Sequence, residues 1–425
     1  MPTFQTVRGM RDLLGKEAQT FTYIINEAQK VASLFGFKKV FTPHVESLEL
    51  LSAKSGEEIR QRMFIFEDLG GRKVALRPEF TASIARLATT DLKTEPKPLK
   101  LFSLGTVYRY DEPQRGRYRE FWQSNFELIG TNKPEADTEI ILLTNKFIQT
   151  LNLQGYVFKI GHIGIIRGIL SQEGIEEKTQ NAILQRMDKK EYDLALKLVT
   201  SEKCRQTLQN LIDLKGKDWQ DTLKQVNTLV SSYEMAKTAT DNLLEILTLI
   251  TFSCPNISLT VDPAFARGLE YYTGMIFEIY IPQLEIALGG GGRYDRLMET
   301  FGSESTPAVG CAHGIDRIAI ALQTQNTVSN IGAEHNVMVI PITETVKGEA
   351  LKIAQQLRER GVSVEFELMG RKMGKALEDA DKRGLDYAVI VGKRELEENN
   401  IVLKDLKKRE QIIIPLTELY EKIIK

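Results

Sequence analysis

The alternation of side chains in residues 121–129 constrains the fold of this chain more than any other feature. Successive residues of a strand point to opposite faces of its sheet. One face is largely apolar and belongs in a core: Trp122, Ser124, Phe126 and Leu128. The other face carries a row of polar groups between two apolar ends: Phe121, Gln123, Asn125, Glu127 and Ile129. Because buried polar groups need partners, the pattern predicts a strand with a polar ligand site on one face.

Arginines lie beside this polar row. Residues 107–130 read as a strand, a charged loop and a second strand, with Arg109 in the first strand and Arg115, Arg117 and Arg119 in the loop. Guanidinium groups suit a ligand that carries phosphate or carboxylate. The alternative is a solvated charged turn, because three nearby carboxylates offset much of the charge and exposed ion pairs are weak. The polar row favours a site, and Phe121 could pack flat against a planar ring such as adenine.

The composition limits the class of protein. A length of 425 residues predicts two or three domains. The formal net charge of −1 neither supports nor excludes nucleic-acid binding, because the footprint of that activity is a local basic surface. No run of eighteen apolar residues occurs, and residues 1–15 lack an apolar core of signal-peptide length. We therefore expect a soluble, cytoplasmic protein without membrane contact.

Cysteines and histidines give no sign of a metal site. The three cysteines, Cys204, Cys254 and Cys311, are far apart and form no CxxC pair. This predicts neither a zinc site nor a disulfide framework, as in a reducing compartment. The four histidines are also scattered along the sequence.

Periodicity predicts an α+β organisation in the first three quarters of the chain. An amphipathic helix is expected over residues 17–35, with a strand following it to residue 43. A hairpin is expected over residues 63–76, a short helix over 80–88, strands over 100–110 and 120–129, a helix over 138–151 and a strand over 156–161. Residues 171–251 are helical and charged and interrupt strand-rich stretches, which predicts an inserted helical subdomain. Strands follow over 257–261, 275–281 and 284–288, and residues 308–311 lead into a helix that runs to residue 322.

A polar linker over residues 323–333 precedes a different pattern. Strands over 337–341, 362–367 and 387–391 alternate with helices over 344–360 and 372–383. Such alternation predicts a separate α/β domain with a largely parallel sheet. The chain is thus expected to hold an antiparallel-sheet domain over residues 1–325, with the helical insertion at about 171–251, and an α/β domain over residues 334–425.

Two further motifs carry groups suited to ligands. In Arg77-Pro78-Glu79-Phe80-Thr81, Glu79 or Thr81 could simply cap the following helix, or a carboxylate fixed there could hold a ligand ammonium group. The run from Arg267 to Tyr272 sets an arginine, a glycine and paired tyrosines between two strands. It favours a site over a charged surface loop, and only one of the tyrosines is expected to face a ligand.

The last two motifs are weaker when taken alone. Residues 289–292 are four glycines without the Lys-Ser/Thr of a P-loop or the spacing of GxGxxG, so they indicate only a close approach of backbone to a ligand or strand. Arg317 lies in the first turn of the last helix of the first domain, off its apolar stripe, where a cation opposes the helix dipole. A bound anion would offset that cost; the alternative is a surface arginine. His313 and Cys311 are expected to be structural.

These pieces, in this order, resemble the class II aminoacyl-tRNA synthetases, and in particular the histidyl-tRNA synthetase family. The resemblance covers nearly the whole chain. Residues 8–12 are similar to that family's opening segment. Residues 17–43 resemble motif one, which builds the dimer interface in this class, residues 109–127 resemble motif two, and residues 310–317 resemble motif three. The run from Arg267 to Tyr272 and the pair Gln123 and Glu127 point to histidine as the amino acid.

The resemblance implies a role for each position. The ATP site would consist of Arg109, Arg117, Phe121 and Arg317. The histidine site would consist of Glu79, Phe80, Thr81, Arg109, Gln123, Glu127, Arg267, Tyr271 and Tyr272. Arg109 and Arg267 would be catalytic, with Arg267 replacing, as a fixed cation, part of what a magnesium ion does in related enzymes. The C-terminal domain would bind the anticodon, with Arg371, Lys372 and Lys375 as tRNA contacts.

The implied reaction is the ATP-dependent activation of L-histidine and its transfer to the 3′ end of tRNA(His). ATP with Mg²⁺ would be a substrate complex, no prosthetic group is expected, and the chain would form a homodimer. Three positions depart from the family pattern: Phe80 and Arg296 stand where glycine is usual, and Asp316 stands where glutamate is usual. None of these changes removes an implied ligand.

Two other functions compete with this one. The first is a histidine-sensing regulatory paralogue from histidine biosynthesis, which usually lacks the C-terminal domain and loses catalytic arginines. This chain keeps Arg109, Arg267 and Arg317 and has a full tail. The second is a synthetase for glycine, threonine or proline. Glu127 and the run from Arg267 to Tyr272 favour histidine over these amino acids.

Overall fold

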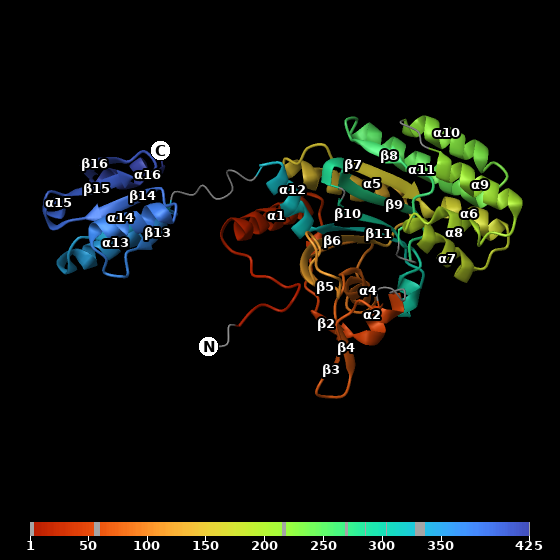
Figure 1. Cartoon of the computed structure of the whole chain (residues 1–425), viewed down its shortest axis with the longest axis horizontal. Helices are drawn as coiled ribbons and strands as arrows, with labels where there is room; N and C mark the ends of the chain where they lie inside the picture. Colours follow the sequence, from red (N-terminus) through yellow and green to blue (C-terminus); the bar gives the residue numbers. More distant parts are fainter. Residues whose placement is uncertain are drawn as a thin grey trace. The chain divides into compact units, whose positions relative to one another are not determined.

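The computed structural model describes residues 4–54, 60–214, 218–267, 271–284, 286–302, 304–327 and 336–424. Contacts between Cα atoms divide the chain into two units, Met1–Ser329 and Asn330–Lys425. The division falls within the stretch for which the sequence predicts a linker. Figure 1 shows the whole chain coloured along its sequence.

An eight-stranded sheet forms the centre of the first unit, in the order β1-β5-β6-β11-β10-β9-β7-β8. Its strands are β1 (Lys38–Lys39), β5 (Leu99–Tyr108), β6 (Glu120–Ile129), β7 (Val157–His162), β8 (Leu259–Val261), β9 (Met275–Ile281), β10 (Ile286–Arg293) and β11 (Ala308–Gly314). The six inner strands pair antiparallel, and the edge pairs β1–β5 and β7–β8 are parallel. This confirms the predicted antiparallel-sheet fold.

Two strand predictions need correction. The strand expected up to residue 43 is wrong beyond Lys39, because β1 is only two residues long. The glycine run was placed after a strand, but it lies within β10, paired with β9 on one side and β11 on the other. Without side chains, the strands can approach a ligand or a neighbouring side chain closely at this point.

Helices cover the sheet and close its core. They are α1 (Gly15–Leu34), α4 (Thr81–Thr89), α5 (Pro134–Thr150), α6 (Ile163–Gln172) and α12 (Ile315–Thr324), with short 3₁₀ turns η1 (Pro282–Leu284) and η2 (Met298–Phe301). Helix α1 has the amphipathic pattern expected of it: Phe21, Ile24, Ala28, Val31 and Ala32 are buried, and Ile25 and Phe35 are half-buried. Helix α12 packs against α1 and β6, so that its first turn lies close to the polar face of β6.

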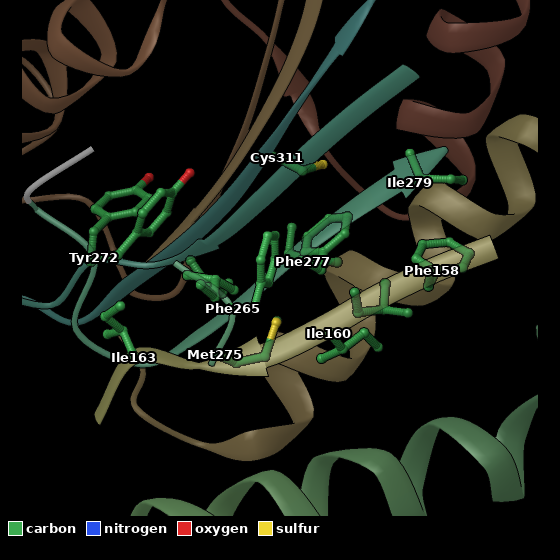
Figure 2. Close-up of a cluster of buried hydrophobic side chains, with 14 of the residues drawn as sticks. Phe158, Ile160, Ile163, Phe265, Tyr272, Met275, Phe277, Ile279 and Cys311 are labelled. Atoms are coloured by element: carbon green, nitrogen blue, oxygen red, sulfur yellow. The ribbon is translucent and has the colours of Figure 1, made fainter. Parts of the chain in front are cut away.

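A core of aromatic and aliphatic side chains supports the β7–β9 side of the sheet. Figure 2 shows Phe158 and Ile160 of β7 beside Phe277 and Ile279 of β9, with Phe265 and Tyr272 towards one end of the group. The rings of Phe158 and Phe277 lie 6.1 Å apart. The loop that carries the two tyrosines is therefore built on a packed apolar base.

A small sheet and a helical insertion complete the first unit. The small sheet has the order β2-β4-β3, formed by β2 (Val45–Ser47), β3 (Ile65–Glu67) and β4 (Lys73–Leu76), with α2 (Leu48–Lys54) beside it. The insertion consists of α7 (Glu177–Asp188), α8 (Tyr192–Leu196), α9 (Glu202–Asp213), α10 (Trp219–Leu229) and α11 (Glu234–Ser253). Figure 1 shows these helices in green at the β7–β8 edge of the large sheet. The helices α7 to α11 occupy most of the stretch for which a helical insertion was expected.

The second unit has a five-stranded sheet in the order β13-β12-β14-β15-β16. Its elements are β12 (Asn336–Pro341), η3 (Glu344–Val346), α13 (Lys347–Glu359), β13 (Ser363–Phe366), α14 (Met373–Lys382), β14 (Tyr387–Val391), α15 (Lys393–Glu397), β15 (Asn400–Asp405), β16 (Glu410–Pro415), η4 (Leu416–Glu418) and α16 (Leu419–Ile424). The three predicted strands pair in parallel, as expected. The antiparallel hairpin β15–β16 was not predicted.

Candidate active site

A cavity of about 550 Å³ opens over the polar face of β6 and the neighbouring β10 and β11. Its volume is in the range of small-molecule sites. Eleven residues expected in the site line it: Glu79, Thr81, Arg109, Arg117, Phe121, Gln123, Glu127, Arg267, Tyr271, Tyr272 and Arg317. They come from segments separated by more than two hundred residues, and the fold brings all of them to one place.

Four predicted site residues lie elsewhere. Phe80 does not line the cavity, because its side chain is fully buried in the core, where the guanidinium of Arg77 lies 4.3 Å from its ring. Arg371, Lys372 and Lys375 belong to the second unit. There Arg371 pairs with the buried Glu367 at 3.2 Å, and the two lysines are exposed.

The row on β6 faces the cavity as its alternation predicts. Phe121, Gln123, Asn125 and Glu127 all line the cavity. Two amide oxygens in this row, Oε1 of Gln123 and Oδ1 of Asn125, are buried and have no hydrogen-bond partner among the described residues. Leaving a buried polar atom unpaired costs about 1–3 kcal/mol. The row is therefore arranged for hydrogen bonds to a ligand, and it includes Asn125, for which no role was expected.

Glu127 lies at the base of the cavity and is 1% exposed. Its Oε2 accepts a hydrogen bond from the hydroxyl of Tyr294, a buried residue of the loop after β10. Gly310 of β11 stands directly opposite, and a Cβ there would lie 1.7 Å from Glu127 Oε2. The hydroxyl of Tyr294 thus fixes the orientation of the carboxylate, and the absence of a side chain at Gly310 leaves room for it.

Substitution of Gly310 by alanine should disable this carboxylate. The new Cβ would displace Oε2 of Glu127 and would also crowd the carbonyl oxygen of Phe126 at 2.7 Å. Crowding of this kind costs about 1–3 kcal/mol, so we expect the KM for a substrate that Glu127 contacts to rise about tenfold or more. Steady-state kinetics and the melting temperature would be measured beside Gly348→Ala, where a Cβ meets no atom within 4 Å. An unchanged KM in a folded Gly310→Ala protein would contradict this reading.

Three arginines converge on the cavity from different elements. Arg109, just after β5, donates from Nε to the carbonyl of Pro78 at 3.0 Å and lies 5.4 Å from the ring of Phe121. Arg267 donates from Nη1 to the carbonyl of Phe277 at 2.6 Å. Arg317, in the first turn of α12, donates to the carbonyl of Ala287 at 2.9 Å. These bonds run to neutral carbonyls, so the charges are offset only in part, by Glu79 and Asp111 near Arg109 and by Glu278 near Arg317.

The environment of these arginines favours an anionic ligand. Burial, followed by the nearby charge of Arg117, lowers the pKa of Arg317. Burial and then the charge of Arg62 lower the pKa of Arg109. Like charges held together in a cavity repel each other, and a phosphate or carboxylate group between them would relieve that repulsion.

The glycines of β10 make room for one of these guanidinium groups. A Cβ on Gly290 would lie 1.8 Å from Nη1 of Arg267. The side chain of Arg267 therefore crosses the bare backbone of β10 to reach the cavity. The glycine run was only a weak indication of this contact, because four glycines do not identify the group that approaches them.

Glu79 combines the two roles between which the sequence could not decide. Its two carboxylate oxygens accept the backbone N–H groups of Thr81 and Ala82, both at 3.1 Å, so it caps the start of α4. The same side chain lines the cavity beside Thr81. The segment is anchored by the buried Arg77, which donates to the carbonyls of Thr42 at 2.7 Å and Thr106 at 3.0 Å. A carboxylate held in this way can accept hydrogen bonds from a ligand ammonium group.

Both tyrosines of the run after Arg267 line the cavity, and the expectation that only one of them faces a ligand stays a prediction. Their ring centroids lie 4.7 Å apart, and the ring of Tyr271 lies 5.7 Å from that of Tyr294. Burial raises the pKa of all three hydroxyls, which stay protonated and can donate hydrogen bonds. Residues 268–270 of the same run lie outside the described residues.

A buried ion pair supports the end of β10. Arg293 donates from Nε to both oxygens of Asp137 in α5, at 3.1 and 3.0 Å, and from Nη1 to the carbonyl of Thr131 at 3.0 Å. Both partners of the pair are almost fully buried. This contact fixes the strand that carries the glycines and leads to Tyr294.

Breaking this pair should destabilise the first unit strongly. In Arg293→Met the carboxylate of Asp137 stays buried without its partner, so we expect a loss of about 3–5 kcal/mol in urea unfolding of that unit. The double variant Arg293→Met/Asp137→Asn should recover part of the loss, since it leaves no buried charge behind. A cost below about 1 kcal/mol for the single variant would show that the pair is not needed.

Sequence reasoning missed several lining residues. Arg62 pairs with Asp111 of the loop between β5 and β6, and both line the cavity. Tyr294 and Gly310 lie in motifs that were noted, but their contact with Glu127 depends on strand register. Met187, Asp188, Lys190 and Tyr192 bring the helical insertion to the cavity wall. No local pattern marks Arg62 or these insertion residues.

Solved structures show the class to which this architecture belongs. The crystal structure of histidyl-tRNA synthetase from Nostoc sp. PCC 7120 matches with a TM-score of 0.84 over 100% of this chain and 99% of that one, at 24% identity. A Bacillus halodurans C structure, described as an ATP phosphoribosyltransferase regulatory subunit/histidyl-tRNA synthetase, matches with a TM-score of 0.76 at 27% identity, over 88% and 96% of the two chains. The fold is that of a class II aminoacyl-tRNA synthetase.

Sequence comparisons identify the family within this class. The family model for histidyl-tRNA synthetase matches residues 9–318, and that for an anticodon binding domain matches residues 336–425. The chain is 38% identical to the histidine–tRNA ligase of Methanocaldococcus jannaschii over 98% of each protein. It is 36% identical to that of Saccharolobus solfataricus over 100% of this chain and 99% of the other. The chain belongs to the histidyl-tRNA synthetase family.

Proposed function

We propose that the chain activates L-histidine with ATP and transfers it to the 3′ end of tRNA(His). The observation that carries this proposal is the row on β6. In this row Glu127 is held by Tyr294 and can accept a hydrogen bond from an imidazole N–H. The amide oxygens of Gln123 and Asn125, which lack a partner among the described residues, lie in the same row, and three arginines line the same cavity. Glu79 and Thr81 at the rim suit the α-amino group of the same substrate. Full-length relatives named histidine–tRNA ligase support the assignment.

The proposed chemistry needs alignment and cations more than it needs a base. The carboxylate of histidine is already ionised and would attack the α-phosphorus of ATP in line with the leaving pyrophosphate. Charge that develops on the phosphoryl oxygens would be stabilised by Arg109 and Arg267, while Arg117 and Arg317 would hold the outer phosphates. Phe121 would stack on adenine.

Magnesium would enter with ATP as part of the substrate complex. In the described ranges, no three His, Cys, Asp or Glu side chains come together as the ligands of a resident metal would. Arg267, which lines the cavity, would supply a fixed positive charge near the reacting phosphate.

Transfer to tRNA is the step that separates this function from simple amino acid binding. The purified chain should attach labelled histidine to a tRNA(His) transcript in the presence of ATP. A tRNA for phenylalanine serves as the matched control and should remain uncharged. No charging of tRNA(His) by active, folded protein would overturn the proposal.

The second unit would contribute to tRNA binding. Lys372 and Lys375 are exposed at the start of α14, and Arg371 precedes them on the same loop. We expect their cations to contact phosphates near the anticodon. At the cavity, the insertion residues Lys190 and Tyr192 lie on the wall that the terminal nucleotide would pass.

The chain would act as a homodimer in the cytoplasm. Helix α1 and the segment after it expose large apolar side chains, with Leu34 at 71% and Phe41 at 81%. These side chains lie in the region that resembles motif one, and exposed apolar side chains are expected on a surface that a second subunit covers. No helix in the described part of the chain is long and apolar enough to cross a membrane. Analytical ultracentrifugation at micromolar concentration should give the mass of a dimer, and a monomer would contradict the proposal.

The regulatory function remains the second candidate. The Bacillus halodurans C structure carries both descriptions, so fold alone does not separate them. The arginines that catalysis needs all line the cavity, and the relatives that match over the full length are named as ligases. These observations favour the enzyme.

A further inference from the structure

The segment before α1 lies along the loop that joins β5 to β6. The carbonyl of Gly9 accepts the backbone N–H of Arg119 at 2.8 Å. Gly9 has a positive φ of 84°, and a Cβ there would lie 2.7 Å from Cγ of Arg119. Arg8 pairs with Glu112 of the loop at 2.8 Å, with both side chains exposed. Residues 8–12, called here the N-terminal strap, are thus held against the loop.

Arg11 of the strap joins three elements through one guanidinium group. Its Nη2 lies 2.8 Å from Oδ1 of Asp316, the residue before Arg317 in α12. Its Nη1 donates to Glu17 in α1. Its Cζ lies 4.0 Å from the ring centroid of Tyr118 in the loop, a cation–π contact.

Asp316 completes the link to β6. Its Oδ2 accepts the backbone N–H of Trp122 at 2.8 Å, and its side chain is 5% exposed. Both oxygens of this carboxylate are therefore bonded, one to Arg11 and the other to the backbone of Trp122. It joins the strap, the start of α12 and the start of β6 in one buried connection.

The elements joined in this way carry the arginines proposed for the outer phosphates. Arg117 lies in the loop one residue before Tyr118, and Arg317 follows Asp316 directly. Nε of Arg317 lies 3.4 Å from the carbonyl of Gly116, so the loop and α12 also meet at the cavity. Two neighbouring cations repel each other, so other groups have to hold their spacing; Tyr118 and Asp316 line the cavity beside them, and Arg11 contacts both from outside it.

We propose that Arg11 is a positioning residue for ATP. Its contacts with Tyr118 and Asp316 fix the distance between the loop and the start of α12. At this distance Arg117 and Arg317 can both bind the triphosphate. Arg11 does not line the cavity and acts only through these neighbours. The inference rests on the proposed function for the identity of its ligand, ATP.

A purely structural role for Arg11 predicts different kinetics. If Arg11 only anchored α1, its loss would lower the melting temperature or reduce kcat without favouring one substrate. If Arg11 positions the phosphate-binding arginines, its loss should raise the KM for ATP and leave the KM for histidine nearly unchanged. The split between the two KM values therefore separates the roles.

The test compares Arg11→Met, Arg11→Lys and Arg8→Met in ATP–pyrophosphate exchange. Arg11→Met removes a charge-assisted contact to Asp316 and the cation–π contact to Tyr118, and it should raise the KM for ATP about 10- to 100-fold. The KM for histidine should change less than about twofold, on the scale of a surface substitution. Arg11→Lys should be intermediate, because one ammonium can keep the bond to Asp316 but cannot also stack on Tyr118. Arg8→Met removes only an exposed pair and should match the native protein.

A double-mutant cycle with Asp316→Asn adds a second readout. The effects of Arg11→Met and Asp316→Asn on the KM for ATP should be clearly less than additive, because both break the same contact. Additive effects, equal changes in both KM values, or no change in folded Arg11→Met would overturn the inference. If Arg11→Met does not fold, Arg11→Lys provides the same comparison.

Failure of the proposed function would be seen separately, in the native protein. Exchange with another amino acid would overturn the histidine assignment, and the Arg11 comparison would proceed with that amino acid. If no amino acid supports exchange, calorimetric titration of ATP into the native and Arg11→Met proteins tests the positioning role directly. Equal affinities would then overturn it.

Discussion

Replacing Arg267 by alanine should lower kcat/KM for histidine-dependent ATP–pyrophosphate exchange by about 10²- to 10³-fold. The side chain lines the cavity with Arg109 and Arg317 and is oriented by its bond to the carbonyl of Phe277. The space above Gly290 allows it to reach that position. Its charge matters most when the phosphoryl oxygens become more negative in the transition state. The loss should therefore fall more on kcat than on the binding of histidine.

The controls for Arg267 separate charge from structure. Arg267→Lys should recover only part of the activity, because one ammonium cannot keep the carbonyl bond and face the substrate at once. Arg296→Ala removes an exposed arginine whose nearest carboxylates lie 3.7 and 3.9 Å away, and it should change kcat/KM less than twofold. A loss below about tenfold in folded Arg267→Ala would contradict the proposed role.

Replacing Glu127 by glutamine should reduce kcat/KM for histidine about 10²-fold, mainly through a higher KM. The substitution keeps the shape of the side chain and removes its charge. An imidazole N–H would lose a charge-assisted hydrogen bond in a buried site, worth about 1.5–3 kcal/mol. Tyr294 donates to the same carboxylate and would have to share a neutral amide with the ligand.

Glu120→Gln is the matched control on the same strand. Glu120 lies at the start of β6, accepts a hydrogen bond from the hydroxyl of Tyr108 at 3.1 Å and is outside the cavity lining. It should leave the KM for histidine unchanged. If Glu127→Gln also left that KM unchanged, the carboxylate would not be the imidazole acceptor.

The residues that sequence analysis placed correctly are those fixed by local geometry. Alternation along β6 predicted that Gln123 and Glu127 share a face, because a strand has a period of two wherever it is placed. The helical period likewise predicted the buried stripe of α1. Arg317 was singled out by its position in the first turn of a helix. Each of these follows from a few neighbouring residues.

The contacts that sequence analysis missed depend on pairing between distant strands. Gly310 stands opposite Glu127 only because β11 pairs with β6 in one register, and a shift of one residue would remove that relation. Tyr294 reaches Glu127 because β10 lies beside β11. Arg11 is separated from Asp316 by more than three hundred residues. Single-sequence patterns do not encode such relations.

Phe80 shows the opposite case, where a motif suggested more than the fold supports. It stands between two cavity-lining residues, Glu79 and Thr81, but its own side chain turns into the core. The bend before α4 directs the side chains of Glu79 and Thr81 to the cavity and the side chain of Phe80 to the core. The predicted place of Phe80 in the histidine site can therefore involve only its backbone.

Amino-acid-dependent ATP–pyrophosphate exchange by the native protein shows which amino acid the cavity activates. All twenty amino acids would be supplied one at a time with ATP, Mg²⁺ and labelled pyrophosphate. We expect exchange with histidine and none above background with the other nineteen. Exchange with a different amino acid, or no exchange with histidine by folded protein, would contradict the proposed function.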